Sequence, residues 1–86
     1  MLVKPILLSG HARLRARQRG ATDSEITETI RESAWVGAGR GRKECQRDFV
    51  FGREWNGQFY ATKRVRPIFL DHAQEIVVVT VYVYYF

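Results

Sequence analysis

The last eleven residues of the chain, 76–86, read IVVVTVYVYYF and constrain the fold more than any other stretch. They include no Gly, Pro or charged residue and are almost wholly β-branched or aromatic, so they predict an extended strand. Alternation would give this strand two different faces. The apolar face would carry Val77, Val79, Val81 and Val83. The hydroxyl-bearing face would carry Thr80, Tyr82 and Tyr84. An unpaired edge this apolar promotes aggregation, so we expect a central position or an edge that another chain covers.

Charge is distributed unevenly along the 86 residues, which suffice for one domain, 1–86, of two layers at most. The formal net charge is +5. Residues 1–43 hold nine of the fourteen Lys and Arg residues but only four of the nine Asp and Glu residues. Such a field favours a polyanion, with nucleic acid ahead of a membrane surface. The alternative is that the charge only keeps a small protein soluble.

Cysteine content and hydropathy indicate the compartment. Cys45 is the only cysteine, so an internal disulfide and a cysteine-based zinc site are excluded. The apolar run at 2–8 is too short and interrupted for a signal peptide, and no stretch approaches the ~20 residues that span a bilayer. The sequence therefore predicts a soluble, cytoplasmic protein with no membrane partner.

Two short helices are predicted after an extended arm at 2–8, where Pro5 favours a sheet edge. Ser9 would cap a helix from about 10 to 19, with Gly20 as its C-terminal stop. The sequence TDSE at 22–25 has the form of a capping box and predicts a second helix to about 32 or 33.

The first helix carries a cationic row. His11, Arg15 and Arg19 recur every four residues, beside Ala12 and Ala16. Alanines let a helix approach its neighbour closely, so we expect the cationic row to lie at the margin of the core.

The rest of the chain predicts a basic loop followed by an antiparallel meander. The stretch GAGRGRK at 37–43 lacks the phosphate-binding loop pattern and predicts a flexible basic loop, which either closes over a phosphate chain or only connects its neighbours. A period of two begins near Cys45, and Asn56-Gly57 predicts a hairpin. The next strand would run from about 58 to 68, with Pro67 ending or shifting its pairing. The predicted fold class is α+β, with two N-terminal helices packed on a three- to four-stranded antiparallel sheet.

The reactive side chains suit cleavage of RNA by its own 2′-hydroxyl. His11, His72 and Cys45 fall on separate elements, so neither a metal site nor a cofactor is predicted. The reaction needs one group to accept a proton, one to donate a proton and cations to stabilise the phosphorane. His or Tyr can transfer the protons, and Arg or Lys can hold the phosphate. An RNA base could stack on Tyr82 or Tyr84.

Three segments resemble a known family. They are H-A-x-x-R-x-x-x-R-G at 11–20, W-N-G-x-x-Y-x-T-K at 55–63 and V-V-V-T-V-Y at 77–82. With them, essentially the whole chain resembles the small bacterial proteins grouped as domain of unknown function 4258. That family is considered distantly similar to RelE-like toxins and to barnase-like, EndoU-like and colicin-like ribonucleases. The resemblance implies a RelE-like fold, RNA cleavage as the ancestral activity and an antitoxin as the usual partner.

The residue pattern and the resemblance together give a candidate site. The candidate catalytic residues are His11, Lys63 and Tyr82. The candidate RNA-binding or phosphate-binding residues are Arg15, Arg19, Arg64, Thr80 and Tyr84. We therefore expect a metal-independent endoribonuclease of RelE-like toxin descent, which requires the cationic row and the hydroxyl-bearing face to converge.

Alternative readings of the same residues stay open. The chain could be a non-catalytic RNA-binding protein, or a homodimer formed through the C-terminal strand. Arg15 and Arg19 could instead form salt bridges with carboxylates, and His11 could simply contact a carbonyl or solvent.

Overall fold

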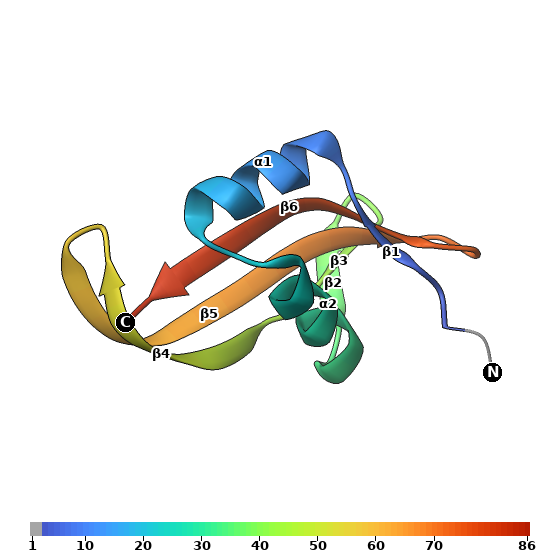
Figure 1. Ribbon diagram of the computed structural model, residues 1–86. Coiled ribbons are helices and arrows are strands. Elements are labelled where there is room, and N and C mark those ends of the chain that lie inside the picture. The colour runs from blue at the N-terminus through green and yellow to red at the C-terminus, as the bar shows by residue number, and fades with distance from the viewer. Residues whose placement is uncertain (1–2) are drawn as a thin grey trace.

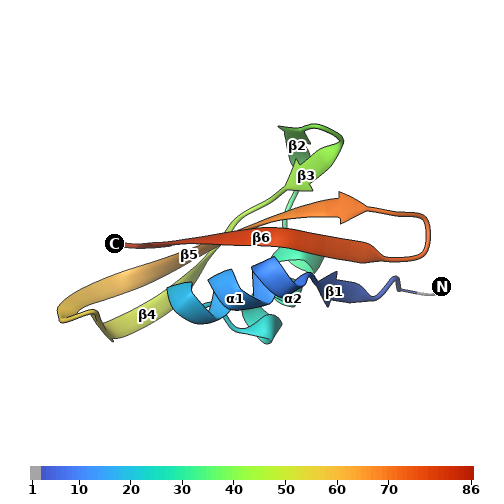
Figure 2. The same ribbon diagram turned by 90° about the horizontal axis from the view of Figure 1, so that it is seen from above.

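Residues 3–86 are described by a computed structural model, in which two helices pack on a mixed six-stranded sheet (Figure 1). In chain order the elements are β1 (Ile6–Leu8), α1 (Gly10–Arg19), α2 (Asp23–Glu32), β2 (Val36–Gly39), β3 (Arg42–Glu44), β4 (Arg47–Trp55), β5 (Gln58–Asp71) and β6 (Ile76–Tyr85). Both helices lie on one side of the β5–β6 pair, and the β2–β3 hairpin projects to the other (Figure 2). We call the sheet surface opposite the helices the open face.

The predicted α+β class is confirmed, whereas the predicted sheet of three to four antiparallel strands is wrong. The strand order is β1-β6-β5-β3-β2, with β4 also paired to β5. The N-terminal arm supplies β1, which pairs in parallel with β6 from Ile6 opposite Ile76 to Leu8 opposite Val78. The β2–β3 hairpin adds two further strands, where the sequence predicted a loop.

The predicted flexible loop at 37–43 is an ordered hairpin. Gly39, Arg40 and Gly41 have φ values of 82°, 56° and 74° and form its turn, and β3 pairs with β5 at Lys43 and Glu44. Glycine-rich composition predicts a loop because glycine disfavours extended structure. Here the glycines instead permit a tight left-handed turn.

The long strand β5 organises the sheet. It pairs with β6 along one edge and with β4 and then β3 along the other. Pairing with β6 continues through Pro67, which lies opposite Val81. On the other edge the partner of β5 changes at this point, from β4, whose pairing ends at Val65, to β3, whose pairing begins at Ile68, so the predicted shift of pairing is confirmed there. Thr62 and Phe86 exchange two backbone hydrogen bonds, so alternation places the nitrogen of Pro67 on the edge away from β6. There it falls in the gap between β3 and β4, where no N–H is required.

A bulge in β6 exchanges the faces of the terminal strand. Ile68 pairs with Thr80 and Phe69 with Val78, so Val79 is an extra residue. The prediction that the apolar face packs against the helices is consequently confirmed for Val81 and Val83 but wrong for Val77 and Val79. Before the bulge, the residues buried against the helices are Ile76 and Val78. The hydroxyl-bearing residues Thr80, Tyr82 and Tyr84 follow the bulge and lie on the open face.

Helix ends agree with the sequence prediction. The Ser9 side chain accepts a hydrogen bond from the Ala12 N–H, and Gly20 ends α1 with a left-handed φ of 85°. Thr22 and Glu25 form the predicted capping box of α2. These local signals determine the helix bounds because each satisfies backbone groups that a helix end leaves unpaired.

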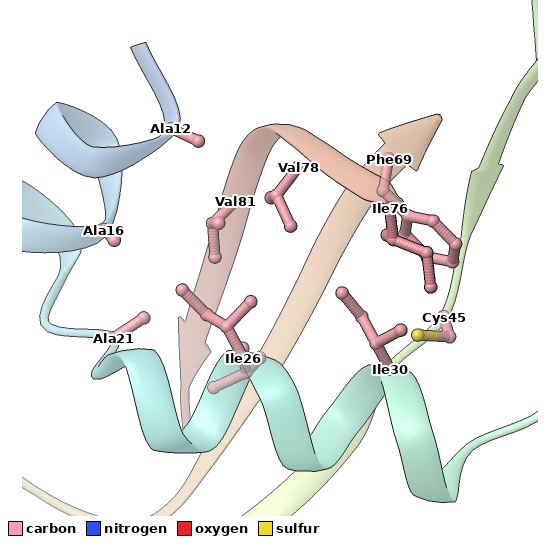
Figure 3. Packing of buried hydrophobic residues seen from close by; sticks show 11 residues of the cluster. Ala12, Ala16, Ala21, Ile26, Ile30, Cys45, Phe69, Ile76, Val78 and Val81 are labelled. Carbon is pink, nitrogen blue, oxygen red and sulfur yellow. The ribbon is translucent and has the colours of Figure 1, made fainter. Parts of the chain in front are cut away.

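The core lies between the helices and the sheet (Figure 3). Ala12 and Ala16 bring α1 close to β6, and Ile26 and Ile30 of α2 point at the sheet. Sheet residues in this core include Val65, Phe69, Val78 and Val81. No helix within residues 3–86 has the length and apolar character needed to cross a membrane.

Candidate nucleic-acid interface

Arg19 links the end of α1 to the open face of β6. Its Nη1 donates a hydrogen bond to the Val81 carbonyl at 2.7 Å. Its guanidinium carbon lies 5.0 Å from the centre of the Tyr82 ring, which is within range of a cation–π interaction. The structure thus brings the last cation of the predicted row together with the hydroxyl-bearing face of β6.

A second guanidinium, that of Arg66 on β5, also lies near the Tyr82 ring, at 5.4 Å from its centre. Arg66 donates from Nη1 to the Tyr84 hydroxyl at 3.0 Å and from Nη2 to Glu44 at 3.1 Å. The hydrogen bond to Glu44 raises the pKa of Arg66 above its usual range. The sequence prediction did not include Arg66 in the site, although it shares a β5 face with Arg64 and pairs opposite Tyr82.

Arg64 extends the same surface toward the C-terminus. It donates to both carboxylate oxygens of Asp48, at 2.7 and 3.0 Å, and lies 5.0 Å from the centre of the Phe86 ring. The hydrogen bonds from Arg64 lower the pKa of Asp48, so that carboxyl is ionised at neutral pH. Asp48 and Glu44 therefore balance Arg64 and Arg66, and a bound phosphate would compete with both carboxylates.

The exposed aromatic rings complete the surface. Tyr82, Tyr84 and Phe86 are 38%, 43% and 53% exposed, respectively. Each lies against an arginine: Tyr82 and Tyr84 contact Arg66, and Phe86 contacts Arg64. Guanidiniums held beside accessible aromatic rings form the combination that binds single-stranded nucleic acid, because the cations attract phosphates and the rings stack on bases.

Lys63 lies on the opposite side of the sheet, among the groups that attach the helices. It is 3% exposed, and its Nζ donates to Glu25 Oε1 and to the Gly20 carbonyl, each at 2.8 Å. The same Glu25 oxygen accepts the Thr22 N–H of the capping box. Lys63 therefore ties the turn between α1 and α2 to β5, and the structure does not bring it together with Tyr82.

This position predicts that Lys63 acts in stability. Breaking a buried ion pair leaves one charge uncompensated, so we expect Glu25→Gln to lower the free energy of unfolding by about 2–3 kcal/mol. Lys63→Met should cost less, about 1–2 kcal/mol, because Glu25 keeps some solvent contact and the Thr22 N–H. Urea denaturation would show the double variant costing less than the two single changes together.

Activity measurements on the same variants distinguish a structural role of Lys63 from the catalytic role that the sequence predicted. A structural Lys63 predicts that folded Lys63→Met protein behaves as wild type toward RNA. Additive costs in the denaturation cycle, or loss of RNA cleavage by a fully folded variant, would contradict the structural role.

The remaining predicted residues lie on α1 and β6. His11 is exposed at the start of α1, and Arg15 is half-buried and donates to Gln18 at 3.1 Å. Thr80 is half-buried on the open face, beside the bulge. Within residues 3–86 neither Arg15 nor Arg19 forms an ion pair with a carboxylate, which the salt-bridge alternative requires.

Cys45 does not contribute a reactive group. The thiol is buried and donates a weak hydrogen bond to the Thr29 carbonyl. Burial, followed by the nearby Glu44, raises the pKa of Cys45 to about 11, so it is protonated at neutral pH. Among the described residues, no group of three or more His, Cys, Asp or Glu side chains is placed to hold a metal ion.

No family model matches this sequence, and neither a curated protein nor a solved structure matches it. The kinship with domain of unknown function 4258 and with RelE-like toxins stays a hypothesis, based on the three sequence segments that resemble that family.

Proposed function

We propose that the protein is a metal-independent endoribonuclease of RelE-like toxin descent, which binds single-stranded RNA on its open face. The observation that carries this proposal is the convergence of Arg19 and Arg66 on the ring of Tyr82. Two guanidiniums beside a phenol combine charge stabilisation with a group that can transfer a proton.

Binding would use the two kinds of side chain differently. Arg19 and Arg66 would hold a phosphate, since guanidinium hydrogen bonds to phosphate are charge-assisted. Tyr82, Tyr84 and Phe86 would stack on the unpaired bases on either side of it. Arg64 would bind a further phosphate if that phosphate displaces Asp48.

Cleavage would proceed by attack of the 2′-oxygen on the adjacent phosphorus. The bond to the 5′-oxygen breaks, which yields a 2′,3′-cyclic phosphate and a 5′-hydroxyl. One group takes the proton of the 2′-hydroxyl, and another gives a proton to the departing 5′-oxygen. We assign these transfers to Tyr82 and His11, with Arg15 and Thr80 bordering the site and Lys63 outside it.

A second candidate is RNA binding without cleavage. The exposed rings of Tyr82 and Phe86 beside arginines favour it, since stacking and charge bind RNA without any proton transfer. On this scaffold a protein partner, either an antitoxin or a second copy, would pair with the edge of β6. That edge is paired with β1 only from Ile76 to Val78.

One assay separates the two candidates. Labelled single-stranded RNA is incubated with protein and excess chelator, and a binding titration is run in parallel. An endoribonuclease gives fragments ending in 2′,3′-cyclic phosphate, whereas a binding protein gives salt-sensitive complexes of intact RNA. Intact, unbound RNA at high protein concentration would contradict both.

Arginine variants test the placement of the site. Arg19→Ala should weaken RNA binding about tenfold or more, because it removes a charge-assisted contact. Arg17→Ala removes the same charge from an exposed position of α1, and we expect it to change the affinity by less than about twofold. Equal losses in the two variants would contradict a specific role for Arg19.

A further inference from the structure

The β2–β3 hairpin is the most basic exposed segment that the proposed site leaves unused. Three exposed cations lie in its turn or directly after it: Arg40, Arg42 and Lys43. The hairpin projects from the sheet on the side away from both helices, which is the side of the open face (Figure 2). Its strand β3 pairs with β5 at Ile68 and Phe69, just beyond Arg66, so the hairpin extends the sheet from the site toward the Leu70 end of β5.

Register determines which of these cations faces the site. Glu44 of β3 contacts Arg66, so its side chain lies on the open face. The irregularity of the hairpin falls in β2, between Gly37 and Gly39, and β3 itself alternates without interruption. Arg42 therefore shares the open face with Glu44, about 7 Å away along the strand, whereas Lys43 points to the other face.

The neighbours of Arg42 leave it accessible. Its partner across the hairpin is Gly39, which has no side chain to cover it. A Cβ placed at Gly37, Gly39 or Gly41 would meet no atom within 4 Å, so the space around these positions is open. Arg42 also forms no ion pair with any carboxylate among residues 3–86.

We propose that the β2–β3 hairpin is an arm that binds the RNA backbone beside the Tyr82 site, with Arg42 as its phosphate-contacting residue. The inference rests on the proposed function and extends it, because the arm lengthens the bound RNA beyond the nucleotides at Tyr82. Paired strands hold the arm in place, so a phosphate binds without the entropy cost of ordering a loop.

The test compares Arg42 with Lys43, which are adjacent on β3 but point to opposite faces. The probe is a fluorescein-labelled 2′-O-methyl oligouridylate of about twelve nucleotides, a length within the range that single-strand sites cover. It has no free 2′-hydroxyl and cannot be cleaved by the proposed reaction. Affinity is measured over a series of salt concentrations for wild type, Arg42→Ala, Lys43→Ala and Arg42→Lys.

We expect Arg42→Ala to weaken binding about three- to tenfold at low salt. One lost phosphate contact should also reduce the slope of log affinity against log salt by about 0.7. Lys43→Ala removes the same charge on the opposite face and should leave the slope unchanged. Arg42→Lys should retain the wild-type slope, since it keeps the charge.

Each outcome decides a different part of the proposal. If wild type binds the oligonucleotide and Arg42→Ala behaves as Lys43→Ala does, the arm is refuted while RNA binding at Tyr82 stands. If wild type does not bind at any salt concentration, the proposed function and the arm are both overturned. Circular dichroism of each variant verifies that the hairpin change leaves the fold intact.

Discussion

Gly20→Ala is expected to destabilise the protein by about 3 kcal/mol, which for a domain of this size lowers the melting temperature by roughly 15 °C. Two costs combine. Gly20 has a φ of 85°, and a side chain in that region costs about 1–2 kcal/mol. A Cβ there would also collide with the Tyr85 hydroxyl and lie 2.8 Å from the Trp55 ring, which adds about 1–3 kcal/mol.

The collision matters because it falls on a hydrogen bond that positions α1. The Tyr85 hydroxyl donates to the Arg19 carbonyl at 2.6 Å, and the Tyr85 ring stacks on Trp55 with centres 4.9 Å apart. Burial raises the pKa of Tyr85, so the hydroxyl keeps its proton and its donor role at neutral pH. Displacing it would move the end of the helix that carries Arg19.

Gly39→Ala provides the matched control. Gly39 has a similar φ of 82°, but a Cβ there meets nothing within 4 Å. We expect only the backbone cost, about 1–2 kcal/mol. Thermal or urea denaturation of both variants separates the backbone cost from the collision, and equal losses would show that the packing of Gly20 against Tyr85 and Trp55 contributes nothing.

The sequence predicted the helices because their signals are local. Ser9, Gly20 and the Thr22–Glu25 capping box each satisfy backbone groups within a few residues, so no knowledge of the rest of the fold is needed. The hairpin at Asn56-Gly57 is confirmed for the same reason, with both residues at positive φ. Elements of this kind can be predicted from one segment of the sequence alone.

The sheet could not be predicted as well, because its geometry depends on pairing between segments that are distant in the sequence. The bulge at Val79 depends on the register against β5, and it reverses the faces assigned to Val77 and Val79. Pro67 is tolerated only because two separate strands share one edge of β5. The bulge has no signal in the residues around Val79, whereas Pro67 indicated a change of pairing but not which strands meet there.

The candidate site shows the same limit. Arg19 and Tyr82 were predicted to converge, since an i, i+4 row and a strand face are periodic features. Arg66 was missed because its role depends on contacts with Glu44 and Tyr84, which lie on other strands. Lys63 was included from the residue pattern and the family resemblance, but its partner is Glu25, 38 positions earlier in the chain.

Removing the hydroxyl of Tyr82 should have the largest effect on the proposed reaction. Tyr82→Phe keeps the ring that Arg19 and Arg66 contact, so RNA affinity should stay within about twofold of wild type. If the hydroxyl transfers a proton, the single-turnover cleavage rate should fall by a factor of about 10² to 10⁴. The measurement pairs single-turnover cleavage with binding of the uncleavable 2′-O-methyl RNA.

Tyr84→Phe is the matched control for Tyr82→Phe. Tyr84 lies two residues away on the same face, and its hydroxyl accepts a hydrogen bond from Arg66. Losing that bond should loosen Arg66 and slow cleavage by about tenfold, well short of the loss in Tyr82→Phe. If the two variants slow cleavage equally while binding is unchanged, the Tyr82 hydroxyl acts only by holding its neighbours in place. His11 would then be the one remaining residue to which a proton transfer is assigned, and His11→Ala would have to abolish cleavage for the proposed reaction to survive.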